Sequence, residues 1–170
     1  MERPMKRVAI VGPGGAGKTT FARRLGERTG LPVIHLDELY WRPGWVATPD
    51  DEWRETVNRL AAADEWILDG NYSRTLDVRA RAADTVLLFD YAPLGNLARA
   101  LRRSLSNYGK EMQAPGCPEH FDLEFLRWIL NYRTRSRPRV LAHLEACGPD
   151  VDVRVLRRPC DARQFLASLT

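Results

Sequence analysis

Glycines, a lysine and threonines spaced for binding phosphate occur together near the start of the chain. Residues 12–20 read G-P-G-G-A-G-K-T-T, which contains the Walker A pattern G-x-x-x-x-G-K-T. In such a loop, backbone N–H groups surround phosphate oxygens, the lysine reaches the β- and γ-phosphates, and the next hydroxyl ligates Mg²⁺. The pattern predicts a nucleoside triphosphate site. We expect its contacts to come from Gly12, Gly14, Gly15, Ala16, Gly17, Lys18, Thr19 and Thr20.

Two carboxylates follow short apolar segments elsewhere in the chain. Asp37 comes directly after residues 31–36, and Asp69 ends the segment 65–69, E-W-I-L-D. Open α/β sheets bind ligands beyond the carboxyl ends of their strands. An acid in the position of Asp69 is the Walker B arrangement, which predicts a metal site made with Thr19. Asp37 fits three roles: accepting a hydrogen bond from an acceptor hydroxyl, holding a water on Mg²⁺, or forming a turn.

Positive charge is concentrated in one part of the chain. The net charge is +4, and residues 97–140 alone hold nine Lys or Arg against four acids. Beside a phosphate-binding loop, such a region favours further phosphate contacts. Binding of nucleic acid and ordinary solvated helix faces are the alternative interpretations.

Several side chains near these segments have more than one interpretation. His35 is interpreted as a buried structural histidine, and Arg74 is expected to reach a transferred phosphoryl group. Rings at Tyr40, Trp41 and Trp45 lie in residues 39–49, which we expect to form a loop without periodicity. They could line an acceptor pocket, stack on a base, or form a small core beneath a long loop.

The elements that must position these residues alternate between strand and helix. Apolar segments at 8–11, 31–36, 65–69, 85–90 and 151–156 read as strands, with helical patterns between them. This order predicts an α/β fold: a five-stranded parallel sheet with helices on both faces. A helix from Pro93 is expected to carry its leucines (Leu94, Leu97, Leu101 and Leu105) on one side. Residues 107–120 lack an apolar period and are expected to form a mobile loop.

Size and composition bound the remaining possibilities. The chain has 170 residues, enough for one α/β domain, and 44% of them are hydrophobic. We find no apolar run of about 18 residues and no hydrophobic signal segment at the N-terminus, so we expect a cytoplasmic protein without a membrane partner. The three cysteines are widely spaced, which is typical of a reducing compartment.

Four segments resemble one known family. They are G-P-G-G-A-G-K-T-T, H-L-D-E-L-Y-W-R-P-G-W, D-E-W-I-L-D-G-N-Y and N-Y-R-T-R-S-R-P-R. The chain is similar over nearly its whole length to the DNA topology modulation proteins, a branch of the adenylate-kinase-like P-loop nucleotide kinases. Asn71-Tyr72-Ser73-Arg74 departs from the Phe-Pro-Arg that follows the D-G segment in adenylate kinases, which leaves the acceptor open.

The resemblance implies a nucleotide-kinase-like fold formed by a single domain, residues 1–170, with a lid-like insertion at about 104–139. It also implies ATP and Mg²⁺ as cofactors. The arginines expected at the lid and the transferred phosphate are Arg99, Arg103, Arg133 and Arg137.

Three functional hypotheses follow. The first is an ATP- and Mg²⁺-dependent phosphotransferase that acts on a small acceptor, with Lys18, Asp37 and the four lid arginines in catalysis. The second is a nucleotide-dependent regulator associated with DNA, although no base-reading motif is visible in the sequence. The third is a nucleoside triphosphate hydrolase that uses the same residues without an acceptor.

Overall fold

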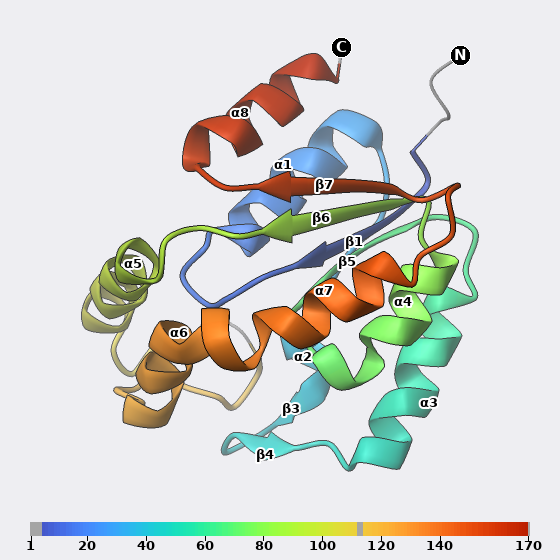
Figure 1. The fold of residues 1–170 in the computed structure, drawn as a ribbon. Helices are drawn as coiled ribbons and strands as arrows, with labels where there is room; N and C mark the ends of the chain where they lie inside the picture. The colour runs from blue at the N-terminus through green and yellow to red at the C-terminus, as the bar shows by residue number, and fades with distance from the viewer. Residues whose placement is uncertain (1–4, 112–113, 170) are drawn as a thin grey trace.

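The computed structural model describes residues 5–111 and 114–169, and its centre is a five-stranded parallel sheet (Figure 1). The strand order is β2-β5-β1-β6-β7, so the phosphate-loop strand β1 is central. All four pairings in this sheet are parallel. The predicted α/β fold is therefore confirmed. The strands are β1 (Arg7–Val11), β2 (Val33–His35), β5 (Trp66–Asp69), β6 (Thr85–Phe89) and β7 (Asp152–Leu156).

Helices cover both faces of the sheet, because its central strands are apolar on both sides. Val8 and Ile10 of β1 pack in one core with α1 (Lys18–Thr29) and α8 (Pro159–Ser168). Ala9 and Val11 pack in a second core beneath three other helices (Figure 1). Those helices are α3 (Asp50–Ala61), α4 (Leu76–Ala82) and α7 (Arg137–Glu145), and the 3₁₀ turn η1 (Ser73–Thr75) precedes α4.

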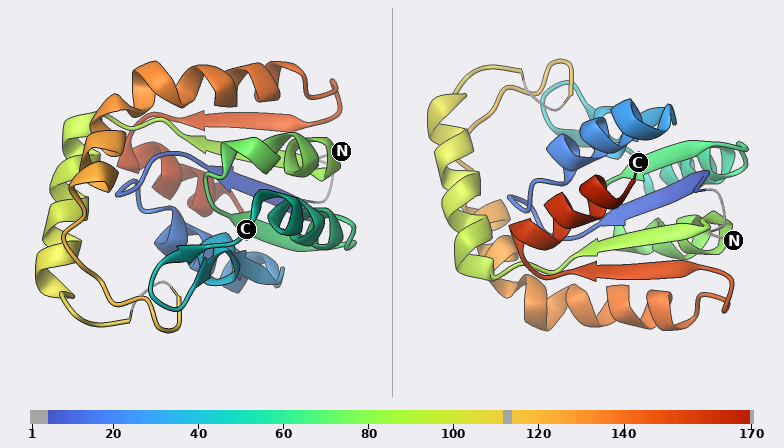
Figure 2. Two further views of the ribbon diagram at one scale, coloured as in Figure 1. Left: turned by 90° about the horizontal axis from the view of Figure 1, so that it is seen from below. Right: turned by 90° about the horizontal axis from the view of Figure 1, so that it is seen from above.

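Two further helices, α5 (Pro93–Ser106) and α6 (Leu123–Arg135), lie together beyond the carboxyl ends of the strands (Figure 2). The helix expected from Pro93 is confirmed as α5, but its leucines do not form its buried face. Leu94 and Leu105 are 74% and 70% exposed, whereas the buried residues are Asn96, Ala100 and Ser104. The physical reason is close packing on the phosphate loop, where a Cβ on Gly15 would lie 2.1 Å from the Asn96 carbonyl oxygen.

The segment after β2 is more regular than expected. Instead of a loop at 39–49, the chain forms the short helix α2 (Leu36–Tyr40) and then a hairpin of β3 (Trp41–Arg42) and β4 (Val46–Ala47). The turn places Gly44 and Trp45 at φ of 77° and 62°. Residues 41–47 are called the aromatic hairpin below.

In the part of the chain that the structure describes, none of the helices combines the length and the apolar character needed to cross a membrane.

Candidate active site

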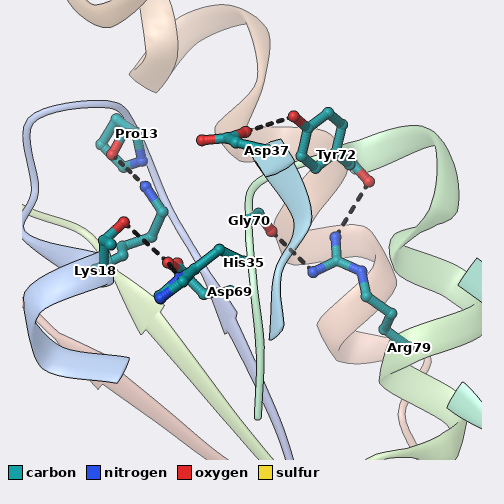
Figure 3. A network of polar contacts seen from close by, with 9 residues as sticks. Pro13, Lys18, His35, Asp37, Asp69, Gly70, Tyr72 and Arg79 are labelled. Atoms are coloured by element: carbon teal, nitrogen blue, oxygen red, sulfur yellow. Dashed lines mark hydrogen bonds and ion pairs between the residues drawn. The ribbon is translucent and has the colours of Figure 1, made fainter. Parts of the chain in front are cut away.

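The phosphate loop connects β1 to α1 at the centre of the sheet. Gly17, at φ 85°, precedes α1, and Lys18 is the first residue of that helix. The Lys18 ammonium turns back over the loop and donates to the Pro13 carbonyl at 2.8 Å (Figure 3). Burial lowers the pKa of Lys18, an effect partly opposed by Asp69 and Asp37. The loop therefore has an amine and a helix N-terminus at the place where an anion binds.

Asp69, at the end of β5, meets the phosphate loop and β2. Its Oδ2 atom accepts from the Thr19 hydroxyl at 3.0 Å and lies 3.0 Å from His35 Nδ1. Its Oδ1 atom is buried and has no hydrogen-bond partner within the described residues. A buried carboxylate oxygen in this state calls for a ligand. Because Mg²⁺ takes oxygen ligands and keeps several waters, Thr19 and Asp69 fit a magnesium ion bound together with phosphate. The contact with Asp69 also accounts for the part-buried position of His35.

Asp37 lies in the first turn of α2 and is held by an aromatic side chain. The Tyr72 hydroxyl donates a hydrogen bond to Asp37 Oδ1 (Figure 3). Burial is the largest influence on the Asp37 carboxyl and raises its pKa, although Tyr72, Lys18 and Arg103 act against it. Burial likewise raises the pKa of the Tyr72 phenol. Asp37 and Lys18 thus influence each other electrostatically, which places the carboxylate beside the phosphate loop.

Residues 70–72 connect these groups, and sequence reasoning gave Asn71 and Tyr72 no role. Asn71 Oδ1 accepts from the backbone N–H of Gly12 at 3.2 Å and from the Tyr132 hydroxyl at 3.3 Å. Beneath the segment, the buried Arg79 donates to the carbonyls of Gly70, Asn71 and Tyr72 at 2.8, 3.3 and 3.2 Å. In the sequence, the only indication of a role for Asn71 and Tyr72 is that residues 71–74 differ from the Phe-Pro-Arg of adenylate kinases.

The predicted lid arginines divide into two groups. Arg99 Nε donates to the Gly15 carbonyl at 2.6 Å. Arg103 pairs with Glu119 at 3.4 Å, and its guanidinium lies 5.9 Å from the centre of the Phe125 ring. The Phe125 ring covers the phosphate loop, since a Cβ on Gly14 would lie 2.3 Å from Phe125 Cζ, so both arginines lie at the phosphate loop.

The other arginines lie differently. Arg137 forms a two-pronged ion pair with the buried Asp90, with contacts of 2.9 to 3.0 Å. Arg133 is exposed near the end of α6. Arg74, expected near a transferred phosphate, is 78% exposed and pairs with Asp50 at 2.5 Å. In this structure these three side chains do not join the phosphate loop.

Residues 107–122, called the lid segment below, connect α5 to α6 and contact the aromatic hairpin. The backbone N–H of Gly44 donates to the Gly116 carbonyl at 2.8 Å, and Trp45 Nε1 donates to the Pro118 carbonyl at 3.0 Å. Within the described lid segment, Gly109 donates to the Glu119 carbonyl at 2.8 Å, and Glu111 and Pro118 form a bridge. The lid segment therefore has defined backbone contacts here; its mobility stays a prediction.

The three aromatic residues predicted for an acceptor pocket or a small core form one continuous series of rings, with the centres of Tyr40 and Trp41 4.9 Å apart. Tyr40 packs against Trp53 and Tyr72, with ring centres 5.1 and 4.6 Å apart. Trp41 packs edge-on against Trp45, whose ring centre lies 5.3 Å from that of His120. The series thus runs from Tyr72, which contacts Asp37, through Tyr40 and Trp41 to Trp45 at the lid segment.

Comparisons with known proteins found a relative by sequence and several proteins of similar fold. No family model matches the chain. It is 31% identical over 168 residues to adenylate kinase from Mycobacterium leprae, covering 96% of this chain and 83% of that protein. Its structure resembles shikimate kinase from Acinetobacter baumannii in complex with shikimate (TM-score 0.60, 19% identity, 97% and 90% of the two chains covered). It also resembles shikimate kinase from Bacteroides thetaiotaomicron (TM-score 0.58, 18% identity, 97% and 96% covered).

Proposed function

This chain belongs to the adenylate kinase family, and from that premise we propose that it transfers a phosphoryl group from ATP to a hydroxyl group of a small molecule. Membership of a kinase family makes the chain a nucleotide or small-molecule kinase. The finer proposal, a hydroxyl acceptor, depends on one observation: the Asp37 carboxylate lies beside the phosphate loop and is oriented by Tyr72.

The donor side of the proposal uses the phosphate loop. Backbone amides and the α1 N-terminus bind the phosphates, and the Lys18 ammonium exchanges its contact with Pro13 for a phosphate oxygen. Thr19 and Asp69 would hold Mg²⁺, because they meet at 3.0 Å and Asp69 keeps one buried oxygen without a partner. When bound, the ion supplies positive charge for the phosphates.

The acceptor side uses Asp37. A carboxylate repels a second phosphate, such as that of a nucleoside monophosphate, but accepts a hydrogen bond from a hydroxyl and takes its proton during attack. Tyr72 fixes the carboxylate by donating to Oδ1. The reaction needs little covalent help from the protein, so alignment of this hydroxyl with the γ-phosphate is the main requirement.

Charge at the transferred group would come from Arg99 and Arg103. Arg99 already contacts the Gly15 carbonyl. Arg103 contacts the lid segment through its ion pair with Glu119. When phosphate is present, these donors can move from protein oxygens to phosphate oxygens. Arg137 supports α7 through Asp90 in this proposal. Arg133 has no role at the phosphates in it.

The test is a screen of phosphoryl transfer from ATP to nucleosides, nucleoside monophosphates, sugars and other hydroxyl-bearing metabolites, followed by Asp37→Asn. We expect a hydroxyl compound to be phosphorylated and Asp37→Asn to lower turnover by about a hundredfold or more while ATP affinity stays within a few-fold. Transfer only to nucleoside monophosphates would contradict a hydroxyl acceptor. Release of ADP that no acceptor increases would favour the hydrolase hypothesis.

The DNA hypothesis is tested in the same assay. Adding duplex DNA at moderate salt should leave ATP turnover unchanged under the kinase proposal. If DNA instead changes turnover, and each arginine substitution weakens DNA binding by a similar modest step, the basic region serves nucleic acid.

A further inference from the structure

Arg79, on α4, is fully buried and donates to three successive backbone carbonyls of a segment that contacts both sides of the site. The side chain is 0% exposed, and burial lowers its pKa to about 10. Its Nη1 atom donates to Gly70 and its Nη2 atom to Asn71 and Tyr72. Among the described residues, its Nε atom has no hydrogen-bond partner. Figure 3 shows the guanidinium beneath Gly70 and Tyr72.

A buried cation at this position contributes little net stability to the fold. Removing a charge from water costs several kcal/mol, about as much as a good set of hydrogen bonds returns, and an apolar side chain of similar volume is often no worse. The irregular backbone at 70–72 does need donors for its buried carbonyls. The planar guanidinium serves that need with a fixed fork, which a flexible amine reproduces only in part.

The segment that Arg79 holds has one contact toward each substrate side. Toward the phosphate loop, Asn71 accepts from the Gly12 N–H at 3.2 Å. Toward the proposed acceptor, Tyr72 donates to Asp37. Asp69, the proposed metal residue, directly precedes the segment. The distance between the phosphate loop and Asp37 therefore depends on a backbone that Arg79 holds at three carbonyls, beside the bonds from Gly70 N–H to Ile10 and from Thr75 to Tyr72.

We propose that Arg79 is a positioning residue, which holds residues 70–72 so that the phosphate loop and Asp37 keep the separation that phosphoryl transfer requires. The inference rests on the proposed function for its kinetic consequence, since a misplacement of about 1 Å can cost about a hundredfold in rate. Its structural consequence, joint rigidity of the two sides, does not depend on the acceptor.

The experiment compares Arg79→Lys with Arg54→Lys as a matched control. Arg54 also holds the neighbourhood of α4, through Arg74 and Asp77, but it is about half-exposed and does not contact residues 70–72. Both proteins are measured for unfolding temperature, MgATP affinity, turnover and amide hydrogen exchange. We expect Arg79→Lys to lower turnover about a hundredfold and MgATP affinity by no more than about tenfold. Arg54→Lys should leave both near the wild-type values.

Hydrogen exchange separates positioning from simple loss of stability. In Arg79→Lys, exchange should rise in residues 8–17 and 69–75 together while β6 stays protected. Faster exchange throughout the chain, with turnover reduced only by the unfolded fraction, would overturn the proposal. So would wild-type turnover in a folded Arg79→Lys protein. If no hydroxyl acceptor is found but exchange rises in both segments, positioning stands and the proposed acceptor chemistry fails.

A second pair of variants decides the matter if Arg79→Lys does not fold. Asn71→Ala removes the contacts with Gly12 and Tyr132, and Tyr72→Phe removes the contact with Asp37. Both variants leave Arg79 in place. Under the proposal Arg79 still holds the other side, so the two effects on ATP hydrolysis or transfer should multiply to within about threefold in the double variant. If each contact instead depends on the other, the turnover of the double variant will differ tenfold or more from the product of the two single effects. That result would show that the role given to Arg79 is wrong.

Discussion

The Thr19 hydroxyl donates a 3.0 Å hydrogen bond to Asp69, joining the first turn of α1 to the end of β5. The two residues are 50 positions apart in the sequence, and parallel pairing of β1 with β5 brings them together. Their oxygens form the oxygen-rich corner of the phosphate loop. Since the second Asp69 oxygen is buried without a partner among the described residues, this corner is suited to a hard cation.

Replacing Asp69 by Asn should therefore raise the Mg²⁺ concentration needed for half-maximal turnover by about tenfold or more. An amide supplies one neutral oxygen in place of a carboxylate. Titration of turnover with Mg²⁺ at fixed ATP measures the change. Glu65→Gln, just before the other end of β5 and about half-exposed, is the control and should leave the titration unchanged. An Asp69→Asn titration that overlays the wild type would remove Asp69 from the metal site.

Lys18→Ala should abolish measurable MgATP affinity and turnover without lowering the unfolding temperature. Among the described residues, the Lys18 ammonium donates only to the Pro13 carbonyl, and burial already disfavours its charge. Removing the side chain should therefore cost the fold little stability. Calorimetric titration with MgATP and thermal unfolding test both parts. Arg24→Ala, on an exposed position of the same helix, is the matched control. Retained affinity in Lys18→Ala would refute the assignment of the phosphate loop.

Asp37→Asn should stabilise the protein at neutral and alkaline pH. Burial raises the pKa of Asp37 above its ordinary value of 3.8, so the ionised form is disfavoured in the fold. That destabilisation is complete above the raised pKa, shrinks as the pH falls through it, and is absent below 3.8, where folded and unfolded states are both protonated. Unfolding temperatures of both proteins across pH 3 to 8 measure the difference. An equal gain at every pH would exclude titration of Asp37 as its source.

Turnover should also depend on the ionisation of Asp37, but in the opposite direction to stability: the ionised form is less stable and more active. If ionised Asp37 accepts the acceptor proton, wild-type turnover falls as the pH drops through the raised pKa, above the range of an ordinary carboxyl. The residual turnover of Asp37→Asn should lack that acidic limb. If turnover falls at the same acidic pH in the wild type and in Asp37→Asn, the fall is caused by another group.

Arg103→Ala should lower turnover by about a hundredfold or more, because an arginine aimed at a transferred phosphoryl group contributes about 10³ to 10⁵ in rate. Arg133→Ala is the control: its side chain is exposed, and the change should be within twofold. Single-turnover assays at saturating ATP compare the two variants. Equal modest losses in both would contradict a specific role for Arg103.

Gly116→Ala should detach the lid segment from the aromatic hairpin. Gly116 has φ 73°, and a Cβ there would lie 2.8 Å from the Pro43 Cβ. Gly109 has nearly the same φ, 75°, but open space around it, so Gly109→Ala isolates the backbone cost of about 1–2 kcal/mol. We expect faster amide exchange at residues 41–47 and lower turnover in Gly116→Ala than in Gly109→Ala. Identical behaviour of the two variants would mean that the contact has no role.

The sequence was informative where local chemistry decides position. The phosphate loop, the strand that ends at Asp69 and the strand before Asp90 follow from glycine spacing and apolar runs. In the structure β5 ends at Asp69 and β6 ends at Phe89, one residue before the predicted end. The leucine period of α5 predicts the helix but not its buried face, because the helix packs on glycines of the phosphate loop through Asn96 and Ala100. Helical periodicity shows that a face exists, but the neighbouring backbone determines which face is buried.

Long-range partners could not be predicted. Arg137 was predicted at the transferred phosphate, whereas it pairs with Asp90, which lies 47 positions away in the sequence. Arg79 gave no signal at all, since an arginine within a short helix usually faces solvent. Asn71 and Tyr72 were visible as a departure from a pattern, and their contacts with Gly12 and Asp37 depend on how β1, β2 and β5 lie side by side.

The contact between the aromatic hairpin and the lid segment bears on how such an enzyme can diversify. Among the described residues, three hydrogen bonds join the two segments, and each ends on a backbone carbonyl: that of Gly116, that of Pro118 and, from Cys117 Sγ at 3.2 Å, that of Arg42. Contacts of this kind constrain the path of the chain more than the identity of its side chains. Substitutions along the lid segment that keep Gly116 and Cys117 can therefore accumulate without removing these hydrogen bonds. New acceptor preferences can then evolve over the site while the phosphate loop stays unchanged.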